Sequence, residues 1–104
     1  VQTPWQHADS YSSFHLYPIR ITLRKIKKTH RQVYDFFKLG GIDVNLHYIP
    51  VYLQPYYETM GFKQGYCPEA EHFYRETISI PMYPTMSYNQ QSKVIQELKK
   101  ALDT

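Results

Sequence analysis

The sequence predicts a small α/β protein, an α+β sandwich whose short, largely antiparallel sheet of three to four strands carries helices on one face. Stretches with the two-residue period of strands alternate with stretches of helical period, and glycine or proline separates many of them. The chain has 104 residues, 42% hydrophobic and 20% charged, which is typical of one folded domain. We expect an irregular lead-in over residues 1–13 and the domain itself over residues 14–104.

The first strand is predicted over residues 14–23. Every second side chain from Tyr17 onward is large and apolar, which is the period of a half-buried strand. Pro18 has no backbone N–H to donate, so it should lie where no partner is needed, as on an edge. Trp5 is expected to anchor the lead-in. The alternating residues are Tyr17, Ile19, Ile21 and Leu23.

The first helix is predicted over residues 29–41, followed by a second strand over residues 42–48. Thr29 and Gln32 form a capping-box pattern at the helix start, and Gly40 and Gly41 supply its end. The inward-facing helix residues are Val33, Phe36 and Phe37. In the strand, Ile42, Val44, Leu46 and Tyr48 should point to one side, and Asp43, Asn45 and His47 to the other.

Four further elements are predicted in the second half. A short helix should begin at Pro55 and end at Gly61, and a longer one should begin at Pro68. A third strand is expected over residues 78–84, and Ser87 with Gln90 indicates the capping box of a last helix. The inward-facing residues are Ala70, Phe73 and Tyr74 in the longer helix, and Gln91, Val94, Ile95, Leu98, Ala101 and Leu102 in the last.

Composition narrows the class of protein. The net charge is +3, and the basic run at 24–28 is short, so neither indicates a nucleic-acid partner. The strands also lack the aromatic and glycine pattern of an RNA-recognition motif. The five histidines are scattered and Cys67 is the only cysteine, which argues against a structural zinc site. No run reaches the roughly 18 apolar residues of a membrane helix.

The single cysteine also excludes an internal disulfide and suits a reducing cytoplasm, where we expect the protein to act. The chain begins at Val1 rather than at methionine, so we expect a fragment or a processed product.

"HYIPVYLQPYY", residues 47–57, is the stretch most indicative of function. Long ordered loops are usually functional. Tyrosine and histidine offer flat faces with hydrogen-bonding tips, which suit a sugar or a nucleotide. The plainer interpretation, that these side chains wrap the core, fits Ile49, Val51 and Leu53, and fits His47 less well.

Three stretches together resemble a known family. They are "FHLYPIRI", "GIDVNLHYIPVYLQPYYETMGF" and "CPEAEHFYRETISIPMYPTMS". They are similar, in this order, to the C-terminal domain of the DegT-type sugar-nucleotide aminotransferases, a branch of the fold-type I pyridoxal-phosphate enzymes. Within the family, "THRQV" and "GIDVNLHYIP" resemble most the members on the route to pseudaminic acid.

The resemblance implies a homodimeric enzyme whose large N-terminal domain holds pyridoxal phosphate on a lysine. It also implies transfer of an amino group, in the family usually from glutamate, to a 4-keto nucleotide sugar in bacterial surface polysaccharide or flagellin glycan biosynthesis. Seven lysines do not match the family's cofactor-binding motif, so we expect this chain alone to bind no cofactor covalently and to be inactive. Those lysines are Lys25, Lys27, Lys28, Lys38, Lys93, Lys99 and Lys100.

The resemblance also implies where substrate contacts lie, because the family's counterpart of residues 47–57 lines the nucleotide-sugar side of the cleft. His47 is the first candidate. Tyr52 stands where the family often has histidine. The tyrosine keeps a hydrogen-bonding group at the tip of its side chain but loses the positive charge that a histidine can carry. His15 also matches the family, and we interpret it as structural or hinge-forming. The remaining candidates are Tyr48, Gln54 and Tyr56.

Two other classes stay open on the sequence: a stand-alone, non-catalytic module that binds a nucleotide sugar or another small ligand, and a plain interaction domain. An enzyme fragment predicts an exposed apolar face where the large domain docks. A stand-alone module predicts a self-contained surface and a pocket formed by residues 47–57 alone.

Overall fold

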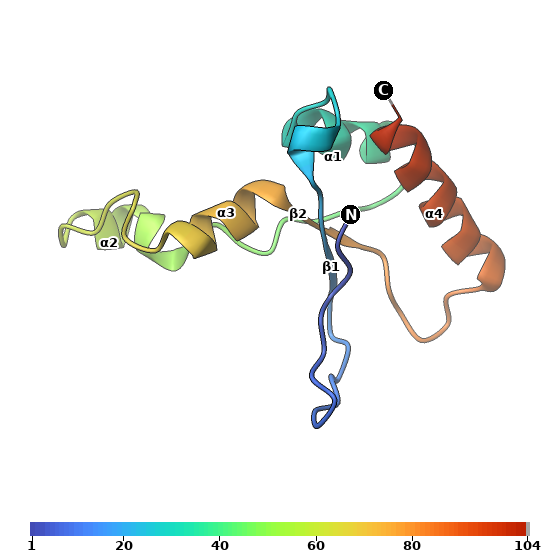
Figure 1. Cartoon of the computed structure of the whole chain (residues 1–104), viewed down its shortest axis with the longest axis horizontal. Coiled ribbons are helices and arrows are strands. Elements are labelled where there is room, and N and C mark those ends of the chain that lie inside the picture. The colour runs from blue at the N-terminus through green and yellow to red at the C-terminus, as the bar shows by residue number, and fades with distance from the viewer. Residues whose placement is uncertain (104) are drawn as a thin grey trace.

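The computed structural model describes residues 1–103. Helices α1 and α4 lie together on one side of a two-stranded sheet, and α2 and α3 project from it (Figure 1). The elements in chain order are β1 (Tyr17–Arg20), the 3-10 helix η1 (Leu23–Lys25), α1 (His30–Leu39), the 3-10 helix η2 (Val51–Leu53), α2 (Pro55–Glu58), α3 (Pro68–Glu76), β2 (Thr77–Ile80) and α4 (Tyr88–Leu102).

The sheet is antiparallel, as predicted, but shorter. β1 pairs with β2, with Pro18 opposite Ser79. A single bridge adds an extended segment on each outer side, Gln2 beside Arg20 and Asn45 beside Ser79. The expected α/β fold is therefore confirmed, with two strands and two bridged segments in the described residues.

The predicted strand over residues 42–48 reaches β2 only at Asn45, whose N–H and C=O exchange bonds of 3.1 and 2.8 Å with Ser79. β2 is four residues long because α3 ends directly before it and Pro81, which has no N–H to donate, follows it. The neighbouring segment therefore has little strand to pair with.

Pro18 lies as predicted. Arg20 exchanges both backbone hydrogen bonds with Gln2, away from β2. Backbone groups two residues apart on a strand point the same way, so the missing N–H of Pro18 also faces away from β2, where no ladder bond is lost.

The core lies between the sheet and the two large helices. Val33 and Phe37 of α1 are fully buried, and Ile78 of β2 lies beneath them. The predicted capping boxes are both present, at Thr29 for α1 and at Ser87 for α4. The buried cluster consists of Ile21, Val33, Phe37, Ile42, Val44, Ile78, Val94 and Ala101.

Helix α3 differs from its prediction. Ala70 is exposed and Phe73 is 40% exposed, so the expectation that they face inward is wrong; Tyr74 is half-buried. The buried side chain is Glu71, whose carboxylate accepts the Gly65 N–H at 2.8 Å. α3 packs toward the loop before it rather than on the core, and an acceptor on that side satisfies a backbone donor of the loop.

Three other expectations are wrong because side chains predicted to be buried are exposed. Trp5 is 82% exposed and therefore does not anchor the lead-in within this chain. Tyr48 is 69% exposed, so the apolar alternation of residues 42–48 ends at Leu46. On α4, Gln91 is exposed and Ile95 is 44% exposed, because the apolar stripe is wider than the surface that covers it.

Two projections make the molecule extended (Figure 1). We call residues 3–16 the N-terminal arm and residues 49–76 the helical arm. The radius of gyration is 15.5 Å, whereas a compact chain of this length has about 13 Å. No helix among residues 1–103 has the length and apolar character needed to span a bilayer.

Candidate functional site

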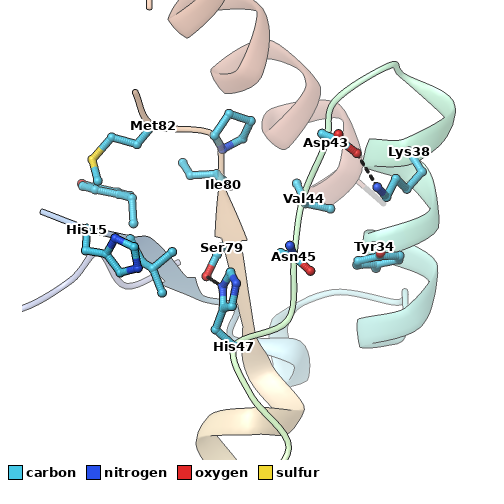
Figure 2. A pocket seen from close by; sticks show the side chains of 13 residues that line it. His15, Tyr34, Lys38, Asp43, Val44, Asn45, His47, Ser79, Ile80 and Met82 are labelled. Atoms are coloured by element: carbon cyan, nitrogen blue, oxygen red, sulfur yellow. Dashed lines mark hydrogen bonds and ion pairs between the residues drawn. The ribbon is translucent and has the colours of Figure 1, made fainter. Parts of the chain in front are cut away.

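An open cavity of about 280 Å³ lies beside the sheet, where β2, the bridged segment around Asn45 and helix α1 meet (Figure 2). The lining combines histidine rings, an asparagine amide, serine and tyrosine hydroxyls and a lysine–aspartate ion pair with several apolar side chains. The lining residues are His15, Leu16, Tyr17, Tyr34, Lys38, Asp43, Val44, Asn45, His47, Ser79, Ile80, Pro81 and Met82.

His47 forms one wall of this cavity. The Asn45–Ser79 bridge places His47, two residues further along, beside the Ser79 side chain. Nδ1 of His47 lies 2.8 Å from Oγ of Ser79 (Figure 2). The ring of Tyr48 packs edge-on against the imidazole at 4.6 Å between centroids, and the peptide bond between the two residues is cis. His47 is thus held on two sides and remains half-buried.

An ion pair between Lys38 and Asp43 also lines the cavity (Figure 2). The hydrogen bond from Lys38 holds the pKa of the Asp43 carboxyl below its ordinary value of 3.8. The same bond raises the pKa of the Lys38 ammonium above 10.5. Both groups are therefore charged at neutral pH, and Nζ of Lys38 also lies 5.8 Å from the ring centroid of Tyr34.

His15 lies across the cavity from Asn45, on the chain just before β1 (Figure 2). The fold brings His15 and His47 to one cavity although they are far apart in sequence. The role predicted for His15, structural or hinge-forming, stays untested. Its exposed ring at the cavity wall makes it available to a ligand.

Sequence reasoning did not single out Lys38, Asn45 or Ser79 as functional. Asn45 alternates with His47 on the polar side of the same segment, a signal that could have found it. Ser79 gave no such signal, because it lies 32 positions from His47 and meets it only through packing. Lys38 and Asp43 are five positions apart across the turn that ends α1, and this spacing is a local signal that could have found the pair.

The other candidates from residues 47–57 do not line this cavity. Tyr48 and Tyr56 are 69% and 66% exposed, and Gln54 is exposed at the start of α2. Tyr52 is occupied within the chain: its hydroxyl accepts the N–H of Cys67 at 3.2 Å and donates to the Cys67 carbonyl at 3.1 Å. The pKa of the Tyr52 hydroxyl is raised, and the largest cause is that the hydroxyl is partly removed from water.

The aromatic side chains of the helical arm stack edge-to-face in series. The ring pairs lie 5.1 to 6.2 Å apart between centroids, a geometry that aromatic quadrupoles favour. In this stretch, therefore, His47 faces the cavity and several tyrosines shape the arm. The pairs are Tyr52–Tyr66, Tyr66–Phe62, Phe62–Tyr57 and Tyr57–Tyr56.

The cavity's own residues do not fit covalent attachment of pyridoxal phosphate. A lysine that forms a Schiff base needs an uncharged amine, which burial or a nearby cation provides by lowering its pKa. Lys38 has the opposite environment, because Asp43 raises its pKa. Within residues 1–103 no three histidine, cysteine or acidic side chains gather as metal ligands do.

The antiparallel α/β fold matches part of the fold of solved fold-type I sugar aminotransferases. Helicobacter pylori PseC, an aminotransferase involved in the biosynthesis of pseudoaminic acid, has a similar structure. The TM-score is 0.74 at 26% identity, over 88% of this chain and 24% of PseC. Residues 1–99 match the DegT/DnrJ/EryC1/StrS aminotransferase family. The chain belongs to this family, which confirms the family predicted from the sequence.

Two curated relatives match this chain in sequence over a similar share of their own length as PseC does in structure. The spore coat polysaccharide biosynthesis protein SpsC of Bacillus subtilis is 32% identical over 93% of this chain and 25% of its own length. The dTDP-3-amino-3,4,6-trideoxy-alpha-D-glucose transaminase of Streptomyces venezuelae is 30% identical over 88% of this chain and 23% of its own length. The chain thus spans about a quarter of the relatives it matches.

Proposed function

We propose that this chain is the small C-terminal domain of a pyridoxal-phosphate-dependent aminotransferase. The full enzyme would transfer an amino group from glutamate to a 4-keto nucleotide sugar in bacterial surface polysaccharide or flagellin glycan biosynthesis. The observation that carries the proposal is the family match over residues 1–99. The structural likeness to PseC supports a substrate of the pseudaminic acid type.

The chain's own part is to form the substrate-side wall of the active site. His47 is the residue most suited to contact the nucleotide sugar, because it lines the cavity and is held by Ser79. Tyr48, Gln54 and Tyr56 are exposed and do not line the cavity, and a second domain or subunit could complete a substrate contact with them. Tyr52 is the weakest candidate, since its hydroxyl already bonds to Cys67.

The cofactor lysine belongs to the large N-terminal domain, and the raised pKa of Lys38 supports this assignment. Pyridoxal phosphate would supply the electron sink for amino transfer. The exposed aromatic side chains of the two arms support docking on the large domain and in a homodimer. They include Trp5 at 82% and Tyr11 at 88% exposure.

The stand-alone binding module is the weaker alternative. It requires a pocket formed by residues 47–57 alone, yet only His47 from that stretch lines the cavity. It also requires a self-contained surface, whereas both arms expose large apolar side chains. Both observations favour a domain that is completed by other parts of a larger protein.

Substitution of His47 tests the proposed function in the polypeptide at its natural full length. His47→Ala should raise the KM for the nucleotide sugar about three- to ten-fold, the value of one hydrogen bond, and raise the KM for glutamate less. Steady-state kinetics with each substrate varied in turn gives both constants.

His72→Ala is the matched control, because His72 is an exposed histidine on α3 that does not line the cavity. It should leave both constants unchanged. Equal increases in both KM values for His47→Ala would indicate a packing role for His47. A full-length polypeptide that transfers no amino group to any nucleotide sugar would contradict the proposed function itself.

A further inference from the structure

Ser79 is a buried serine that lines the cavity. It is 5% exposed, and both of its backbone polar groups bond to Asn45. β1 pairs with it on the other side, through Pro18. Ser79 is therefore held between two chain segments. Its hydroxyl forms a hydrogen bond with Nδ1 of His47 (Figure 2).

A count of hydrogen-bond donors and acceptors indicates which atoms of Ser79 and His47 carry the protons. A serine hydroxyl has one proton to donate, and a neutral imidazole has one N–H and one bare nitrogen. Among residues 1–103, Nδ1 of His47 is the only hydrogen-bond partner of the Ser79 hydroxyl. A buried hydroxyl proton without an acceptor costs free energy. The arrangement that avoids this cost has Ser79 donating to Nδ1, with the proton of His47 on Nε2.

We infer that Ser79 is a positioning residue that fixes His47 in the tautomer with Nε2–H, so that this N–H is a hydrogen-bond donor toward the cavity. The imidazole lines the cavity, and within the described part of the chain Nε2 has no protein partner. The N–H is thus available to an acceptor oxygen of a ligand. That this ligand is a nucleotide sugar, offering a phosphate or hydroxyl oxygen, rests on the proposed function.

Selective nitrogen-15 labelling of histidine, in the polypeptide at its natural full length, reads the tautomer without turnover. Long-range proton–nitrogen spectra at neutral pH should show Nδ1 of His47 unprotonated and Nε2 protonated. The signals that disappear in His47→Gln assign the residue. Ser79→Ala removes the donor to Nδ1, so the two nitrogen shifts should move toward each other as both tautomers become populated.

Ser79→Thr keeps the hydroxyl and should restore the wild-type shifts, which a merely structural role for Ser79 would not predict. His72, which is exposed, should keep its shifts in every variant. If Ser79→Ala does not fold, Ser79→Cys replaces it, because a thiol is a weak donor. A protonated Nδ1 in the wild type, or unchanged His47 shifts in the variant without the hydroxyl, overturns the inference.

Kinetics then separates this inference from the proposed function. In an active enzyme, Ser79→Ala should raise the KM for the nucleotide sugar about three- to ten-fold and leave the KM for glutamate unchanged, with Ser79→Thr close to wild type. An unchanged KM for the sugar would overturn the role of the Nε2–H in binding. An inactive wild type with the expected tautomer would contradict the proposed function and leave the positioning role standing.

Discussion

Glu71 shows how a single acidic residue can be buried at little cost. Its carboxylate accepts the N–H of Gly65 at 2.8 Å, and Arg75 lies 3.8 Å away on the next turn of α3. A buried polar group is tolerated when its hydrogen bonds are made. The hydrogen bond also ties α3 to the loop before it, where Gly65 has a φ of 94°, a conformation that favours glycine.

Removal of this acceptor should destabilise the chain. Glu71→Ala should lower the free energy of unfolding by about 1–3 kcal/mol, because the Gly65 N–H loses its partner. Urea-induced unfolding followed by circular dichroism measures the change. Glu69→Ala makes the same substitution on the same helix, at a side chain that is 89% exposed, and should cost less. Equal costs for the two variants would show that the hydrogen bond adds nothing.

Helices α1 and α4 begin in the same way, and each start depends on residues three positions apart. Ser87 accepts the N–H of Gln90 at 3.1 Å, and the Gln90 side chain accepts the N–H of Ser87 at 2.8 Å. This reciprocal arrangement satisfies two backbone donors that the helix itself leaves without partners. The end of α1 is equally local, since Gly40 is its C-cap and the next residue, Gly41, adopts a φ of 72°.

The capping box of α4 gives a prediction at the scale of the element. Ser87→Ala should lower the free energy of unfolding by about 1 kcal/mol, the usual value of an N-cap side chain. Ser92→Ala is the matched control, because it makes the same change inside α4, where alanine is the better helix former. Thermal and urea unfolding both report the difference. A cost for Ser87→Ala no larger than for Ser92→Ala would contradict the prediction.

At the scale of the whole molecule, the body and the two arms differ in how they are stabilised. The body buries its apolar side chains between the sheet, α1 and α4. The arms expose theirs, including Trp5, Tyr11 and Tyr66. An extended shape with exposed aromatic side chains is typical of a surface that another domain or subunit covers.

Trp5 provides the test of this division. Trp5→Ala should change the free energy of unfolding of the 104-residue chain by less than about 0.5 kcal/mol, since exposed substitutions away from special features are usually neutral. Phe37→Ala, in the core, should cost about 3–5 kcal/mol in the same urea titration. A cost above about 1 kcal/mol for Trp5→Ala would show that the N-terminal arm packs on the body of this chain.

The sequence by itself determined the features that depend on near neighbours. Both capping boxes involve residues three apart, the glycine that ends α1 follows it directly, and alternation placed Ile19 and Ile21 in the core. The family was also readable, because its motifs are short stretches of contiguous residues. Such features need no knowledge of which distant segments meet.

The tertiary structure alone decided the features that join distant segments. His47 meets Ser79 across 32 positions, Tyr52 meets Cys67 across 15, and the N-terminal Gln2 meets Arg20. Each contact depends on the register of a short sheet or on the path of a loop, and the alternation of side chains is the same for several registers. For that reason the sequence could place His47 on a polar face, but only the packing of β2 could show that Ser79 holds its ring.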